Sequence, residues 1–278
     1  MTFPLGRRAA LAAPLVALLP SAVRAQQDAF PARQVQIVVP FPPGSATDLM
    51  ARLLTEPIQR ALGQAVIVEN RSGATGAIGA TAVARAAPDG HTILLGTSSV
   101  NSVLPAMRPD VGYDTLRDFA PVLLVASFPN MLVVHPDVPY WGSAPAVTDL
   151  LAGRVSMRFD NMATVWPHVQ RGALRALGVT GLQRSALAPQ VPAIAEVLPG
   201  YEATSWVGFM APARTPRSSV AKLAEAARSV LALPAVVQRM TELGADPGGG
   251  GPDELARFLR SDVEKWLRVV REAGVKPE

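Results

Sequence analysis

A strand that runs through a Pro-Pro-Gly turn straight into a helix is the feature that most limits how this chain can fold. Val35–Val39 is β-branched apart from one glutamine, and residues 40–44 form the turn. Apolar residues then recur at helical spacing over 49–62, and Gly63 provides a natural stop. Pro57 lies inside this pattern and should kink or break the helix. A strand followed at once by a helix is typical of α/β proteins.

Two more strands repeat the pattern. Residues 66–69 form one and residues 92–95 the other, and an alanine-rich helix ending by Ala87 lies between them. Three glycines at three-residue spacing (73, 76 and 79) open that helix. Their spacing is not the dinucleotide-binding fingerprint, and close packing of a helix on a sheet explains it better. The repeated units predict a parallel sheet with helices on both faces.

The second half of the chain does not continue the repeated strand–helix units of the first half. An apolar run over 121–134, broken at Pro129, predicts either two strands or one bent crossing strand. Residues 181–204 are expected to be loops, and the glycine run at 248–251 a flexible connector or tight loop. The other expected elements are helices over 143–151, 220–231 and 255–270, and strands over 155–159, 174–179 and 205–210.

The first 25 residues read as a signal peptide rather than as part of the fold. Arg7 and Arg8 precede an apolar run over 9–19, and a small-residue site predicts cleavage after Ala25. The run is too short for a membrane-spanning helix, which needs about 20 residues. An exported protein is therefore expected.

Charge and composition exclude several classes of function. The formal net charge is +4. Three arginines and no acids lie in residues 1–25, so the charge without that segment is only +1. No basic stripe remains to indicate a nucleic-acid partner. The chain has no cysteine, which excludes disulfides, thiolate metal sites and a cysteine nucleophile.

The sequence shows little sign of a catalytic motif. The three histidines have no metal-ligand spacing, and no Gly-x-Ser-x-Gly elbow is present. We expect neither a metal nor a cofactor, and we expect that the protein is not an enzyme.

Three polar segments are candidates for binding an anion. The turn at 44–48 opens a helix, whose N-terminal amides and dipole favour negative charge. The cluster at 97–102 follows the third strand, and in open α/β sheets ligands bind beyond the carboxyl ends of the strands. Asp160 and Asn161 follow a later strand. An ordinary turn, a polar surface loop and a turn-forming Asx pair are the respective alternatives.

The order of several motifs resembles a known family. These are residues 38–48, Val66-Ile67-Val68-Glu69-Asn70-Arg71, Ala87-Pro88-Asp89-Gly90, Leu94-Leu95-Gly96-Thr97, Gly142-Ser143-Ala144-Pro145-Ala146 and Phe159-Asp160-Asn161. Together they resemble the substrate-binding proteins of tripartite tricarboxylate transporters, the Bug family. The resemblance implies an α/β, two-lobed type II periplasmic binding protein fold (a Venus flytrap). Lobe 1 would hold residues 26–124 and 211–278, and lobe 2 residues 125–210.

The resemblance also assigns the candidate segments to a carboxylate cleft. Two loops of lobe 1 would form one wall, and the third motif would belong to the other lobe. The expected ligand-binding residues are Gly44, Ser45, Ala46, Thr47, Asp48, Thr97, Ser98, Ser99, Asn101, Asp160 and Asn161. Arg71 is expected to be structural.

The chain departs from the family pattern at Val138-Pro139-Tyr140-Trp141, where it joins two segments directly. Family members carry a longer stretch there, so on the order of fifty residues are expected to be missing. A truncated smaller lobe would expose a sheet edge and apolar faces. It would then bind carboxylate weakly or not at all, or be rearranged or dimeric.

The sequence therefore predicts a periplasmic solute-binding protein. It would capture a small carboxylate, an organic acid or amino acid, and deliver it to the membrane subunits of a tripartite transporter. The alternative is a ligand-sensing or interaction protein of the same family that works with a sensor protein and no longer serves transport.

Overall fold

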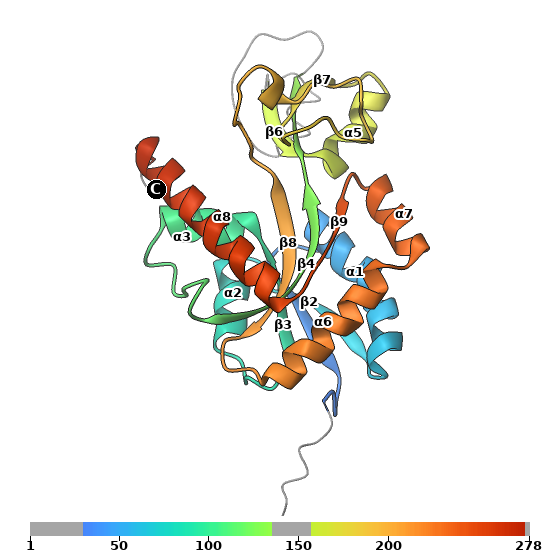
Figure 1. Cartoon of the computed structure of the whole chain (residues 1–278), viewed down its shortest axis with the longest axis vertical. Coiled ribbons are helices and arrows are strands. Elements are labelled where there is room, and N and C mark those ends of the chain that lie inside the picture. The colour runs from blue at the N-terminus through green and yellow to red at the C-terminus, as the bar shows by residue number, and fades with distance from the viewer. Residues whose placement is uncertain (1–29, 135–156, 276–278) are drawn as a thin grey trace, which may run out of the picture.

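The computed structural model describes residues 30–134 and 157–275, which form two sheets, each covered by helices (Figure 1). The α/β class and the two-lobed architecture are both confirmed. The expected signal segment and the expected helix over 143–151 lie outside the described residues. Within those that are described, none of the helices combines the length and apolarity that a membrane span requires.

The larger sheet has six strands in the order β2-β1-β3-β8-β4-β9. Its strands are β1 (Val35–Val39), β2 (Val66–Asn70), β3 (Thr92–Thr97), β4 (Phe119–Phe128), β8 (Ser205–Pro212) and β9 (Asp246–Gly249). Strand β1 pairs in parallel with β2 and β3, as expected. Strand β8 pairs antiparallel with β3 and β4, because it returns from the second lobe and enters the sheet from the opposite end. Strand β9 also pairs antiparallel with β4. The sheet is mixed rather than purely parallel.

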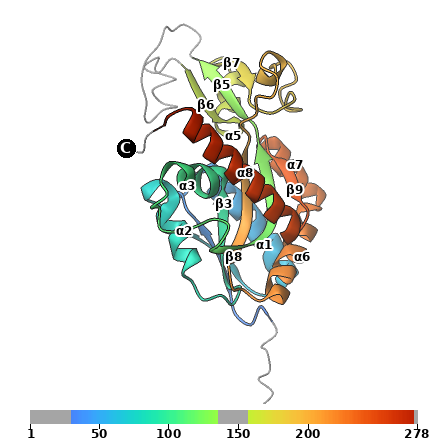
Figure 2. The same ribbon diagram turned by 60° about the vertical axis from the view of Figure 1, so that its left-hand side comes forward.

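Helices cover both faces of this sheet. Helices α1 (Ala46–Leu62), α6 (Arg217–Leu231) and α7 (Pro234–Glu242) lie on one side. Helices α2 (Ala77–Ala84), α3 (Leu104–Met107) and α8 (Pro252–Glu272) lie on the other (Figure 2). The alternation of β1 supplies both layers, because Ile37 packs into the first core and Val38 into the second.

The smaller sheet has the strand order β6-β5-β7. It consists of β5 (Asn130–Val134), β6 (Met157–Asn161) and β7 (Arg175–Val179), with α5 (Met162–Gln170) packed on one face. That face holds a separate apolar core around Met131 and Met162. On the opposite face, Phe159 of β6 is 50% exposed.

Two strands connect the lobes. Strand β4 ends at Phe128 and β5 begins at Asn130, so Pro129 divides the apolar run into two strands. The return path enters β8 at Ser205, beside the end of β4. Asn130 ties the two crossings together, because its Nδ2 donates to the carbonyl of Ala203 (2.8 Å) and its Oδ1 accepts from the Ser205 hydroxyl (3.2 Å).

Some local details differ from expectation. Helix α1 continues through Pro57, so the proline does not end it, and Leu54 and Ile58 on either side of it are buried in the core. Strand β9 includes part of the glycine run that was expected to be a connector or loop. A Cβ on Gly248 would lie 2.3 Å from the Leu124 carbonyl oxygen, so the close approach of β9 to β4 requires glycine there. Helix α7 was not anticipated.

Candidate ligand-binding cleft

A cavity of about 750 Å³ lies between the two lobes, on one side of the crossing strands. Loops at the start of α1 and after β3 form its lobe 1 wall, and β6 with the start of α5 forms the lobe 2 wall. The crossing strands contribute the floor. The cavity therefore contains residues from three distant parts of the chain.

The start of α1 presents unpaired backbone donors to this cavity. Ser45 caps the helix, and its Oγ accepts from the Asp48 amide at 3.2 Å. Gly44 adopts a positive φ of 80°, which turns the chain into the helix. The amides of Ala46 and Thr47, both lining residues, find no acceptor among the described residues. These free donors at the positive end of a 17-residue helix favour an anion.

Asp48 lies behind this wall rather than in the cavity. It is 2% exposed, and its carboxylate accepts from the Gly44 amide, Arg52 Nε and Asn70 Nδ2, each at 2.9 Å. Burial acts to raise the pKa of Asp48, but the hydrogen bonds from Arg52, Gly44 and Asn70 outweigh it and leave the pKa below its usual value. The ionised carboxylate thus holds the turn in place.

The segment after β3 supplies hydroxyls. Thr97, Ser98 and Ser99 line the cavity, and Thr97 Oγ1 lies 3.0 Å from Ser99 Oγ. Asn101 is fully buried behind them, where its Oδ1 accepts from the Thr97 amide at 3.1 Å. A Cβ on Gly96 would lie 2.6 Å from that same oxygen, so glycine makes this tight turn possible.

The lobe 2 wall comes from β6 and the first turn of α5. Asn161 caps α5, with its Oδ1 accepting from the Ala163 amide at 3.1 Å. Asp160 Oδ1 accepts from the Asn161 amide at 2.7 Å, and Asp160 Oδ2 forms an ion pair with Arg158 Nε at the same distance. Phe159 also lines this wall.

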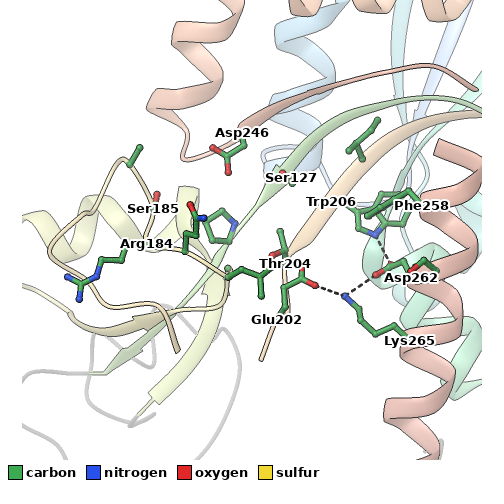
Figure 3. Close-up of a pocket in the computed structure, with 17 residues that line it drawn as sticks. Ser127, Arg184, Ser185, Glu202, Thr204, Trp206, Asp246, Phe258, Asp262 and Lys265 are labelled. Carbon is green, nitrogen blue, oxygen red and sulfur yellow. Dashed lines mark hydrogen bonds and ion pairs between the residues drawn. The ribbon is translucent and has the colours of Figure 1, made fainter. Parts of the chain in front are cut away.

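A second cavity, of about 680 Å³, lies on the other side of the crossing strands (Figure 3). Four of its polar side chains are paired with one another. Trp206 Nε1 donates to Asp262 at 2.7 Å, and Lys265 bridges Asp262 (3.2 Å) and Glu202 (3.3 Å). Because these three charged groups already satisfy one another, a ligand could bind them only by breaking those pairs. Trp206 lines both cavities.

Nine of the eleven residues expected from the sequence line the front cavity. They are Gly44, Ser45, Ala46, Thr47, Thr97, Ser98, Ser99, Asp160 and Asn161. Asp48 and Asn101 instead support the wall from behind. The sequence reasoning missed Arg158, which directly precedes the Phe159-Asp160-Asn161 motif. It also missed the floor residues Phe128, Asn130, Ser205 and Trp206, although the apolar crossing segments that carry them were recognised.

No catalytic or metal centre emerges from the part of the chain that the structure describes. His, Asp and Glu side chains form no group of three there that could hold a metal ion. The cleft is lined by backbone amides, by hydroxyl groups, by the start of helix α5 with its Asn161 cap, and by the Arg158–Asp160 ion pair. Together these groups can bind an anion.

This is the two-lobed fold of periplasmic solute-binding proteins, with a cleft between the lobes. A family model described as "Tripartite tricarboxylate transporter family receptor" matches residues 50–141 and 136–275. The chain belongs to this family, so the resemblance seen in its motifs is confirmed. Family members are receptors rather than enzymes, as the sequence predicted.

Two similar sequences illustrate the relationship. The chain is 38% identical to the UPF0065 protein in the tcbD-tcbE intergenic region of Pseudomonas sp. strain P51, over 96% of this chain and 95% of that one. It is 35% identical to Protein BugT of Bordetella pertussis, over 90% of this chain and 92% of that one. The first alignment runs over 319 positions, whereas this chain has 278 residues, so the relative has residues without a counterpart here.

Two solved structures share the fold. R. palustris Rpa4515 with adipate has a TM-score of 0.82 and 32% identity, over 90% of this chain and 100% of that one. MatC from Rhodopseudomonas palustris with bound malate has a TM-score of 0.79 and 31% identity, over 87% of this chain and 100% of that one.

Proposed function

We propose that this protein captures a small carboxylate, an organic acid or an amino acid, in the front cleft and delivers it to the membrane subunits of a tripartite transporter. The observation that carries the proposal is the convergence of unpaired α1 amides and the Ser98 and Ser99 hydroxyls on one wall of the cavity. Such neutral donors bind a carboxylate without a buried counter-charge. The adipate and malate named for two similar structures support this class of ligand.

The ligand-contacting residues of this proposal are the nine that line the cavity, with Asp48 and Asn101 acting through the loops that they hold. Delivery to a transporter requires export, and the N-terminal segment supplies the signal for it. Cleavage after Ala25 places the chain in the periplasm, where a membrane permease can receive the ligand. Lobe 1 and lobe 2 close on the ligand from opposite sides.

The smaller lobe lacks a segment that its relatives have. Two observations support this part of the proposal. The family model matches in two stretches that overlap at residues 136–141, and the alignment to the Pseudomonas relative is longer than this chain. A shorter lobe 2 offers fewer contacts to the ligand, so we expect weaker binding than a full second wall would give.

Isothermal titration calorimetry on the mature chain, with a panel of aliphatic mono- and dicarboxylates, tests the function. Ser98→Ala removes a lining hydroxyl, and loss of one hydrogen bond to a charged group costs about 1.5–3 kcal/mol, or roughly tenfold or more in affinity. Ser218→Ala is the matched control, because Ser218 is exposed and lies on α6, away from the cleft. Absence of binding to every carboxylate, or equal affinity in the two variants, would contradict the proposal.

A further inference from the structure

The front cleft contains an ion pair that the motif-based site did not include. Among the described residues that line the cavity, Arg158 and Asp160 are the charged ones, and both come from β6. They are two residues apart, so their side chains leave the strand on the same face. The wall across the cleft, in lobe 1, presents only neutral donors.

The ion pair leaves N–H donors of the Arg158 guanidinium available to a ligand. Asp160 Oδ2 lies 2.7 Å from Arg158 Nε, but no acceptor among the described residues is in line with the Nε proton. Four further N–H donors sit on the terminal nitrogens of an arginine. Asp160 is itself fixed by the Asn161 amide, so it restrains where the guanidinium lies. The Arg158 side chain is 38% exposed and therefore open to a ligand.

A carboxylate held at the start of α1 leaves the rest of a small ligand pointing across the cleft toward lobe 2. A neutral end gains nothing from a guanidinium, whereas a second anionic group can accept two parallel hydrogen bonds from it. The charge of Asp160 balances that of Arg158, so the lobe 2 wall has no net charge. Any selectivity for a second anionic group therefore arises from short-range hydrogen bonds rather than from long-range attraction.

We propose that Arg158 is a specificity-determining residue of the cleft, which binds a second anionic group at the end of the ligand opposite the α1 anchor. This inference rests on the proposed function, since it requires a carboxylate in the cleft. It predicts that ligands with two anionic groups bind better than ligands of the same length with one.

Calorimetry with matched probes tests this. Malate is paired with 3-hydroxybutyrate, and adipate with hexanoate, so each pair differs in one carboxylate. Arg158→Met keeps much of the side-chain volume and removes the guanidinium. Arg184→Met is the control, because Arg184 is also a lobe 2 arginine paired with a carboxylate, that of Glu196, but it lies outside the front cleft.

We expect the unaltered protein to prefer the dicarboxylate of a pair by tenfold or more. Arg158→Met should lose most of that preference by weakening dicarboxylate binding, while the monocarboxylate changes less than threefold. Arg158→Lys retains the positive charge but cannot donate two parallel hydrogen bonds, so it should recover part of the preference. A preference that Arg158→Met leaves unchanged overturns this inference alone. If the unaltered protein binds no carboxylate at all, the proposed function and this inference both fail.

Discussion

The buried carboxylate of Asp48 gives the sharpest test of how the cleft wall is held. Asp48→Ala removes the acceptor of the Gly44 amide, one of the two acceptors of Asn70 Nδ2, and the carboxylate partner of Arg52, which keeps its bond to Asn70 Oδ1. Arg52 is 53% exposed and recovers water, so its share is under about 1 kcal/mol. The two remaining bonds to an ionised group bring the expected loss to about 3 kcal/mol of unfolding free energy.

Thermal unfolding followed by circular dichroism measures this loss. A change of about 3 kcal/mol corresponds to a melting temperature roughly 6–12 °C lower for a domain of this size. The pKa of Asp48 is lowered in the folded state, so its contribution is complete above the ordinary value of 3.8 and disappears as the pH falls through the folded-state pKa. The gap between the two proteins should therefore be constant from about pH 7 to 5 and close in stronger acid.

Asp110→Ala is the matched control, because the Asp110 side chain is 78% exposed and should contribute less than about 0.5 kcal/mol. If Asp48→Ala melts together with this control at neutral pH, the turn is not held by the buried carboxylate and the reasoning fails. A gap that persists unchanged below the folded-state pKa would contradict the electrostatic explanation as well.

Two further changes probe the sheet and the hinge. Gly248→Ala places a methyl group against the Leu124 carbonyl and should lower stability in urea by about 1–3 kcal/mol. Gly251→Ala meets nothing within 4 Å and should cost less, under about 1 kcal/mol, because it only replaces the N-cap glycine of α8; equal midpoints for the two would refute the clash. Trp206→Phe removes the donor to buried Asp262 and should cost about 1–3 kcal/mol in the same assay. A midpoint equal to that of the unaltered protein would show that the bond contributes nothing.

Local sequence signals were sufficient for much of lobe 1. The β-branched run Val35–Val39 and the helical spacing up to Gly63 predict β1 and α1 closely, because β1 is buried on both faces and α1 buries one regular apolar face. Strand β9 could not be found in the same way. Its sequence Asp-Pro-Gly-Gly has no strand propensity, and only the approach to the Leu124 backbone makes it a strand. Tertiary contact, which no local pattern encodes, determined that element.

Some residues of the cleft could likewise be predicted from the sequence, and others could not. Residues that follow β1 and β3 were predictable, because the ends of parallel strands meet at one edge of a sheet. Arg158 was not, since an arginine within a strand is usually a solvated surface residue. Asp48 was recognised but given a direct role, because a sequence does not show which way a carboxylate in the first turn of a helix points. Its three donors come from Gly44, Arg52 and Asn70, and only the first of these lines the cavity.

The position of Trp206 has a practical consequence. Its indole packs on the rear side against Phe258 and Asp262 of α8, while the residue itself also lines the front cavity from β8, one of the strands that connect the lobes. A change in the angle between the lobes should therefore alter the surroundings of that ring. In a variant whose other three tryptophans are replaced by phenylalanine, the emission of Trp206 should report closure of the cleft in solution without any attached dye.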